Sequence, residues 1–599
     1  MSLYALLIGV SAPGLNVSLA MDRLTPVLNE LGFARVERCV GDNASRKGML
    51  SRIDALANRV GPEDGALLYY FGHGGRVRFP ELPAPAGEHT FGYVTCKKDR
   101  GAPWEAILDQ ELSTRLTALD AKCGNVTAIL DCCFSGELVR DVVRHPSEAR
   151  QEKVTDWVRE ALADDETLAV DSHPRIVRLT GASPKRQAYA VERSGRHIGR
   201  LTEAFITAVG EAGERPGGLT WATAEHRIRE HVIGAMGMEG QWVNVAGPAR
   251  RRLFSRDSVA LPGTVTFLPG ESPDHGWLRA GWLQGVQIGD RWVVGDPCVD
   301  GDGQLRALAT ATVAKVDRNR AEVRVERTDG ASSPLVAGMP AYVEALAQPI
   351  AVALDPADTV MQTAVAGSPW LAVADADADE RIEREGAGWR VASRSEGEAV
   401  LEFAADEAAT ALAALEDRAR MHTLRRAWAE QEPSAHPLQW SWRRVGDDAP
   451  LPHEGATLTT NDRIRVDVTF EGTAPLNWFV AAIVVDPAGR PHLLSARVPQ
   501  GLELGPGDSE VLGVRHGRAQ QGLPLPWPDE VEGSEGTAAL LIVASRRPIA
   551  LQHLVHPQAA DEDAAFTLQG MASDTERGHK PETSKGCAWE RIPFNLRRS

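Results

Sequence analysis

The hexapeptide Asp131-Cys132-Cys133-Phe134-Ser135-Gly136 follows a short apolar run at residues 126–130. A second apolar run, at residues 66–71, ends in the segment Gly72-His73-Gly74-Gly75. Apolar runs of this length that end in turn residues are typical of buried strands. In open α/β sheets functional groups gather beyond the carboxyl ends of the strands, so we expect the Cys133 thiol and the His73 imidazole to meet there. A cysteine served by a histidine indicates nucleophilic catalysis of the protease type.

Strand periodicity separates the two adjacent cysteines. Side chains alternate between the faces of a strand, so Ile129, Asp131 and Cys133 share one direction, and Leu130 and Cys132 share the other. A carboxylate needs water or a partner, so the face that carries Asp131 is expected to line a cleft. Cys132 then points into the core as a small apolar residue. We therefore predict Cys133 as the nucleophile; an inert core thiol and a disulfide between the neighbours are the alternatives.

The two strand ends resemble those of the caspase-like cysteine peptidases, and within them the bacterial metacaspase or orthocaspase branch. The resemblance rests on a hydrophobic strand ending in His73-Gly74 and a second one ending in Asp-x-Cys-x-Ser-Gly around Cys133. It extends over residues 3–255 and implies an α/β caspase-like domain with Cys133 and His73 as the catalytic pair. It also implies that the Gly74 amide contributes to an oxyanion hole. The alternative for His73 is a polar residue in a glycine-rich turn.

The resemblance further implies a basic residue on the amino side of the cleaved bond. The motif Leu15-x-x-x-x-Ala20-x-Asp22 resembles the metacaspase segment that supplies one acidic wall of the S1 pocket, and Asp131 supplies the other. Paired carboxylates favour Arg, less often Lys, through charge-assisted hydrogen bonds. We therefore expect protein substrates with a basic P1 residue. The alternatives are a solvated helix position for Asp22 and a structural hydrogen bond at the strand end for Asp131.

Length and composition limit the remaining possibilities. The 599 residues are too many for one core, so three or four domains are expected. The net charge of −17 argues against nonspecific binding to nucleic acid or anionic membranes. Seven cysteines without a framework indicate reduced thiols and a cytoplasmic location. Residues 2–10 are interpreted as a first strand rather than a signal peptide, and no apolar run approaches the ~20 residues of a membrane span.

The chain divides into an α/β part followed by all-β domains. Over residues 1–255 strand and helix patterns alternate, which predicts a mainly parallel sheet flanked by helices. Asn43 is expected to cap the helix that carries Met49 and Ile53. The later segments are expected to be a small β-barrel at 256–349, a mixed segment with a helix at 350–435, a β-sandwich at 436–560 and a flexible tail at 561–599.

No cofactor or metal is expected. Metacaspases often bind calcium through several aspartates, and Asp109 stands in the matching segment. However, Gln110, Lys97 and Lys98 occupy the positions where further acids are usual, and lysines oppose a hard cation. The segment at 300–303 resembles a calcium loop but is interpreted as a turn.

Residues 137–174 form a charged linker directly after the cysteine motif. In caspase-like enzymes this linker is where activating cleavage occurs, so we expect a zymogen that is cut here by itself or by an upstream protease. A pair of surface helices is the alternative. By family association alone, such bacterial proteins serve stress or antiviral defence. Two other functions stay open: a catalytically silent caspase-like scaffold, and a thiol hydrolase for a small amide.

Overall fold

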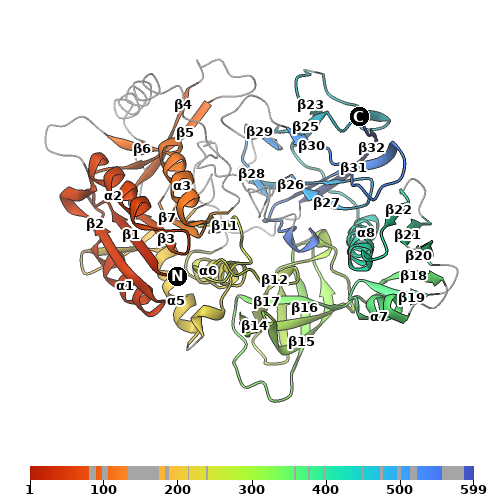
Figure 1. Ribbon diagram of the computed structural model, residues 1–599, viewed down its shortest axis with the longest axis horizontal. Helices are drawn as coiled ribbons and strands as arrows, with labels where there is room; N and C mark the ends of the chain where they lie inside the picture. The colour runs from red at the N-terminus through yellow and green to blue at the C-terminus, as the bar shows by residue number, and fades with distance from the viewer. Residues whose placement is uncertain are drawn as a thin grey trace.

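The structure is a computed structural model (Figure 1). It describes residues 1–79, 89–97, 105–132, 175–182, 188–213, 215–237, 240–355, 359–374, 378–386, 388–394, 399–447, 449–471, 477–494, 501–512, 522–555 and 586–599. Cys133 and the linker at 137–174, both singled out in the sequence, lie outside the described residues.

A six-stranded sheet forms the centre of the N-terminal part. Its order is β11-β8-β7-β3-β1-β2, in which every pairing is parallel except that of β11 with β8. The strands are β1 (Leu3–Gly9), β2 (Phe33–Cys39), β3 (Gly65–Phe71), β7 (Val126–Asp131), β8 (Val177–Thr180) and β11 (Asn244–Ala246). The runs that predicted β3 and β7 are buried along their whole length, as expected for central strands with both faces covered.

Helices cover both faces of this sheet. One face packs on α1 (Ser18–Glu30), α5 (Arg200–Glu211) and α6 (Trp221–Met236), and the other on α2 (Arg46–Arg59) and α3 (Asp109–Cys123). The predicted α/β class of the N-terminal part is confirmed. The predicted cap of α2 is wrong: the Ser45 hydroxyl accepts from the Gly48 amide, while Asn43 lies in the short 3-10 helix Gly41–Ala44.

Two small β-elements stand beyond the carboxyl ends of the central strands. A three-stranded sheet comprises β4 (Gly74–Phe79), β5 (His89–Thr95) and β6 (Ala106–Leu108). A hairpin comprises β9 (Ala190–Arg193) and β10 (Arg196–Gly199), whose turn uses positive φ at Ser194 and Gly195. This matches the two-residue turn that hairpin twist favours.

The predicted barrel is confirmed. It closes in the order β12-β13-β16-β15-β14-β17. Its strands are β12 (Thr264–Pro269), β13 (His275–Leu278), β14 (Arg291–Val299), β15 (Leu305–Val316), β16 (Ala321–Arg327) and β17 (Met339–Ala345). Figure 1 shows it in yellow-green at the lower centre, to the right of α5 and α6.

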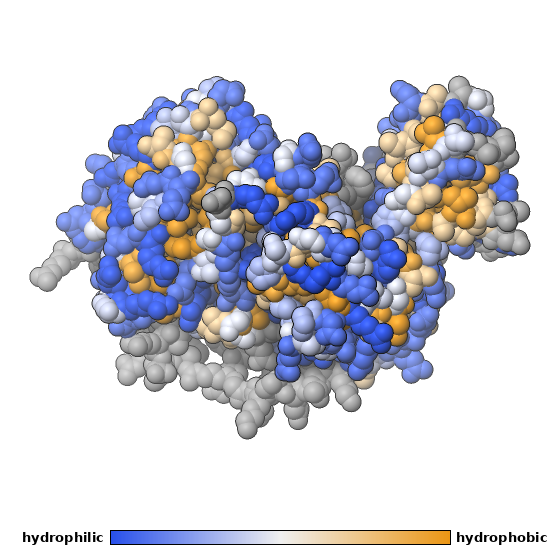
Figure 2. Space-filling view, turned by 90° about the horizontal axis from the view of Figure 1, so that it is seen from below, coloured by the Kyte–Doolittle hydropathy of each residue, from blue (hydrophilic) through white to orange (hydrophobic). Residues whose placement is uncertain are grey.

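The segment after the barrel contains more β-structure than its mixed sequence indicates. A five-stranded sheet, in the order β19-β18-β20-β21-β22, packs with two helices. The elements are β18 (Ile350–Asp355), α7 (Thr359–Gly367), β19 (Leu371–Ala374), β20 (Glu380–Glu385), β21 (Gly388–Ser393), β22 (Leu401–Phe403) and α8 (Ala408–Ala429). Apolar side chains gather on the lobe at the right of Figure 2, the side where Figure 1 shows α7 and β19, whose Val360 and Val373 are exposed.

Two sheets that share one core form the last part. The first contains β23 (Leu438–Arg444), β25 (Arg463–Phe470), β29 (Ser509–Leu512) and β30 (Leu523–Pro524). The second contains β24 (Ala456–Thr459), β32 (Cys587–Arg597), β31 (Glu535–Ser545), β26 (Trp478–Val485), β27 (Pro491–Leu493) and β28 (Leu502–Leu504). The predicted flexible tail at 561–599 is therefore wrong for β32, which lies between β24 and β31 with Ile592, Phe594 and Leu596 in the core.

Buried polar contacts join α6 to the barrel. The two ring nitrogens of His226 lie 2.8 Å from the Thr266 hydroxyl and 3.0 Å from the Thr264 hydroxyl. Arg279 donates to Glu230 over 2.7 Å. Burial, and then the Arg229 charge, lower the pKa of His226 to about 3. The imidazole is thus a neutral, hydrogen-bonded part of this interface.

Candidate active site at the carboxyl ends of β3 and β7

The two strands that carry the predicted catalytic residues are neighbours in the sheet. β3 pairs with β7 in parallel, and the last pair of the register joins Phe71 to Asp131. His73 follows Phe71 by two residues, and Cys133 follows Asp131 by two. His73 and Cys133 therefore each stand two residues beyond the same matched pair, Phe71 and Asp131.

Residues at the end of β7 point alternately to the two helical layers, as predicted. Ile129 packs in the core under α1, α5 and α6, whereas Leu130 and Cys132 pack in the core under α2 and α3. The Asp131 carboxylate accepts hydrogen bonds from Thr202 on α5, so it follows Ile129. Cys132 is 2% exposed and occupies the inward position expected for a core thiol.

The backbone around His73 is fixed by three hydrogen bonds to one carbonyl. The His73 carbonyl accepts from the Tyr70 hydroxyl at 2.8 Å and from the Thr95 amide and hydroxyl at 3.0 and 3.1 Å. Gly72 has no room for a side chain, since a Cβ there would lie 2.5 Å from the Tyr70 hydroxyl oxygen. Gly74 begins β4 and pairs with Val94 of β5, so its amide belongs to a paired strand.

Asp131 is buried rather than open to a cleft. The residue is 1% exposed, and its Oδ2 accepts from the Thr202 amide at 2.9 Å and from the Thr202 hydroxyl at 2.5 Å. Burial raises the pKa of this carboxyl to about 6, although the Thr202 hydrogen bonds favour its charged form. The hydrogen bond at the strand end, the alternative weighed for Asp131, is therefore present.

The second carboxylate oxygen of Asp131, Oδ1, is also buried. No donor of the described residues meets it. Gly181, just beyond β8, lies on that side: a Cβ on it would be 3.1 Å from Oδ1. A buried carboxylate oxygen without a donor destabilises the folded state, so its presence here calls for an explanation.

Asp22, unlike Asp131, lies on the surface, on α1. Its side chain is 48% exposed and forms ion pairs with Arg38 at 2.9 Å and with Arg196 of β10 at 3.0 Å. This is close to the solvated helix position weighed as an alternative. Its carboxylate is already paired with two arginines, whereas no described residue is bonded to Asp131 Oδ1.

Three residues that support the site were not identified from the sequence. Thr202 binds Asp131, Tyr69 lies 2.7 Å from the Thr202 hydroxyl, and Gly199 leaves the space that the carboxylate fills. Their partners lie far away in the chain, so periodicity could not link them. The one available signal was the pair of tyrosines, Tyr69 and Tyr70, within an otherwise aliphatic strand pattern.

Metal ligands do not gather in the parts of the chain that the structure describes. In those parts no three His, Cys, Asp or Glu side chains form a group that could hold an ion. Asp109 is fully buried and accepts from the Gln110 amide, and Lys97 is ion-paired with Asp42. Asp300 accepts from two amides of its own loop, as a tight turn requires.

None of the six described cysteines forms a disulfide, and all six are buried. Burial raises the pKa of Cys39 and of Cys298 to about 11, and the pKa values of Cys96 and Cys123 are raised for the same reason. Buried thiols with raised pKa values react slowly, because the thiolate is the nucleophile.

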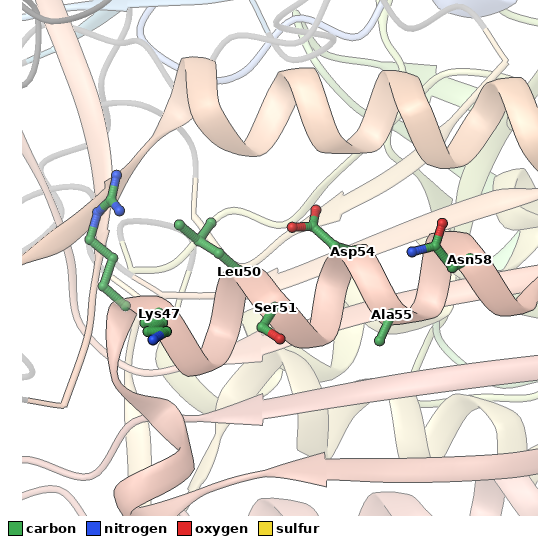
Figure 3. A pocket seen from close by; sticks show the side chains of 7 residues that line it. Lys47, Leu50, Ser51, Asp54, Ala55 and Asn58 are labelled. Carbon is green, nitrogen blue, oxygen red and sulfur yellow. The ribbon is translucent and has the colours of Figure 1, made fainter.

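A hollow of about 550 Å³ lies along α2, and Figure 3 shows that its lining side chains come from that one helix. They are Arg46, Lys47, Leu50, Ser51, Asp54, Ala55 and Asn58. None of the predicted site residues is among them. Most are charged or polar, unlike the apolar walls of typical ligand pockets.

This parallel sheet with its two helical layers can be compared with known proteins. Residues 3–232 match the family model of the caspase domain. The caspase domain thus runs from β1 into α6 and includes both strand ends. It covers less than half of the 599-residue chain.

Solved structures similar to part of the chain include two proteins. Protein GSU0716 from Geobacter sulfurreducens is 17% identical, with 41% of this chain and 92% of that chain covered and a TM-score of 0.31. Caspase-1 from Spodoptera frugiperda is 12% identical, with 41% and 86% covered and a TM-score of 0.25. No curated protein matches the chain. No helix within the described ranges is long and apolar enough to cross a membrane.

Proposed function

We propose that this protein is a cysteine endopeptidase that cleaves proteins after Arg, less often Lys, with Cys133 as nucleophile and His73 as its base. The observation that carries the proposal is the Phe71–Asp131 pair that ends the register of β3 and β7. His73 and Cys133 each follow that pair by two residues, within a caspase domain. The six buried cysteines support Cys133 by elimination, since each lies in a core.

The proposed chemistry needs few groups. The His73 imidazole takes the thiol proton or stabilises the thiolate of Cys133, which attacks the scissile carbonyl. His73 then returns a proton to the leaving amine, and water releases the acyl group from the thioester. The amides of Gly74 and Cys133 are the proposed donors to the oxyanion.

The proposed specificity rests mainly on Asp131. Its Oδ1 is buried and has no partner among the described residues. In a buried setting the attraction between a carboxylate and a guanidinium or ammonium group is strongest. Truncating one partner of a buried charge pair costs about 2–5 kcal/mol, whereas an exposed ion pair contributes roughly 0–1 kcal/mol. We therefore assign the larger part of the discrimination to Asp131, with Asp22 as a secondary wall that must exchange Arg38 and Arg196 for the substrate.

Activation by cleavage within residues 137–174 and regulation by the C-terminal β-domains complete the proposal. The linker leaves the catalytic strand directly and contains arginines that suit the proposed specificity. Cutting it frees the loops that follow β7 to adopt a productive geometry.

Fluorogenic peptides that differ only at P1 test the proposal. Wild-type protein should cleave Arg peptides best, Lys peptides less well and Asp peptides not at all. Cys133→Ala should abolish turnover, and the matched control Cys132→Ala should retain most of it. Absence of turnover in the wild type, together with no labelling by a thiol-reactive peptide ending in Arg, would instead support a silent caspase-like scaffold.

A further inference from the structure

We propose that Thr202 and Tyr69 are positioning residues for substrate recognition, because they hold one oxygen of Asp131 so that the other, Oδ1, meets the cationic P1 side chain. This inference rests on the proposed function and assigns the recognition of P1 to one atom. It also gives α5, which carries none of the predicted catalytic residues, a part in specificity.

The first element of the argument is the start of α5. Gly199 is the N-cap residue and has no side chain to offer, so the third helical residue, Thr202, has an amide without a partner inside the helix. Asp131 supplies the missing acceptor from β7, 2.9 Å from that amide. A carboxylate at a helix N-terminus is also favoured by the helix dipole.

The second element is the direction of the hydroxyl hydrogens. An ionised carboxylate only accepts, so the Thr202 hydroxyl donates to Asp131 Oδ2 over 2.5 Å. Its oxygen can then accept from the Tyr69 hydroxyl, which lies 2.7 Å away. Burial, and then the charge of Asp131, keep the pKa of Tyr69 well above its usual range, so this donor stays protonated.

The third element is the shape of the space around the carboxylate. A Cβ on Gly199 would lie 1.9 Å from Oδ2, so only glycine lets β10 pass this close. The Thr202 donors and this contact hold Oδ2, whereas Oδ1 faces Gly181 and meets no donor of the described residues. An N-cap role alone needs one acceptor and is served by a neutral Ser or Asn. A full negative charge exceeds what the cap requires, and at Oδ1 it is available to a cation.

Three described titratable groups on the neighbouring elements have partners other than Oδ1. On α5, Arg200 pairs with Glu203 at 3.1 Å. On β10, Arg196 pairs with Asp22. On β3, the nearest group is Tyr69, which is engaged with Thr202.

The test compares Thr202→Val, Thr202→Ser and Tyr69→Phe in the full chain. The substrates are an Arg peptide and its neutral isostere with citrulline at P1. Thr202→Val should lower kcat/KM for the Arg peptide at least fivefold, chiefly through KM, and reduce the Arg-to-citrulline ratio by a similar factor. Thr202→Ser should restore the ratio to within twofold of wild type, and Tyr69→Phe should shift it the same way as Thr202→Val but less.

The pH profile gives a second readout. The Thr202 hydrogen bonds favour the charged carboxylate, so Thr202→Val should move the acid limb of kcat/KM for Arg upward from about 6. Thr207→Val is the matched control, because the Thr207 hydroxyl donates only to the Glu203 carbonyl of the same helix, at 2.9 Å. It should leave both the ratio and the limb in place.

The outcomes separate this inference from the proposed function. A wild type that does not prefer Arg to citrulline refutes the proposed specificity, and the inference with it. A wild type that prefers Arg, combined with Thr202→Val and Tyr69→Phe variants that keep the ratio and the acid limb, refutes the positioning role alone. Equal losses for both peptides in Thr202→Val, without rescue by Thr202→Ser, also refute it, because they indicate a general structural role.

Discussion

Replacing Asp131 by Asn is expected to stabilise the fold while removing the preference for Arg. The pKa of the buried carboxyl is raised from 3.8 to about 6, chiefly by burial. The folded state therefore binds the proton more tightly than the unfolded state. Stability falls as the pH rises through this interval and then stays level. Two pKa units correspond to roughly 3 kcal/mol, so above pH 6 the ionised form lowers the free energy of unfolding by about that much.

The amide of Asn does not titrate, so the difference in stability between the two proteins should depend on pH. At about pH 4 the protonated Asp131 and Asn should be equally stable, and at about pH 7.5 the Asn variant should be more stable by up to ~3 kcal/mol. For a unit of this size that is a rise of several degrees in Tm, at roughly 2–4 °C per kcal/mol. At the same time kcat/KM for Arg peptides should fall at least tenfold, since a buried charge pair is lost.

Thermal unfolding of both proteins at the two pH values, with peptide kinetics alongside, is the assay. Asp22→Asn is the control: its exposed side chain should give a change within about 1 kcal/mol at either pH. An Asp131→Asn protein that is no more stable than wild type at pH 7.5, or whose advantage is the same at both pH values, would refute the reasoning about the buried charge.

Further predictions concern the residues around the two strand ends, the effect of calcium and activation by cleavage. Tyr70→Phe removes one donor from the His73 carbonyl and should lower kcat severalfold with KM for Arg peptides little changed; an unchanged kcat would contradict this. Gly199→Ala should destabilise the fold by about 1–3 kcal/mol through overpacking against Asp131, measurable as a lower Tm. Turnover should be the same in chelator and in added calcium, and a strict calcium requirement would point to a missed site. Intact-mass analysis of activated wild type should show a cut within 137–174, with fragments of about 15 and 50 kDa by residue arithmetic; a fully active uncut chain would refute gating.

The sequence predicted the parts of the site that depend on strand periodicity. The alternation along β7 assigned Cys132 to one core and Asp131 to the opposite face, and the structure agrees. This succeeded because a period of two leaves few choices in a buried central strand. The charge of the Asp131 side chain led to the prediction that it lines a solvent-exposed cleft. Its actual partner, Thr202, is 71 residues away, and only the packing of α5 on the sheet brings them together.

Local sequence patterns gave the wrong prediction where two of them competed for the same segment. Asn43 and Ser45 are both good N-caps, and only the backbone conformation decides that α2 begins after Ser45. The polar stretch before the last strand favours a flexible tail. The alternation of Ile592, Phe594 and Leu596 was the better guide to β32.

The interface between α6 and the barrel bears on how the caspase domain can be studied apart from the rest. A fragment that ends before the barrel would place His226 in water, without its two threonine partners. Its imidazole would then regain an ordinary affinity for protons and acquire a charge near pH 6 that the full chain does not carry there. pH profiles recorded on such an excised fragment would therefore include a titration that belongs to the cut surface and not to the full chain.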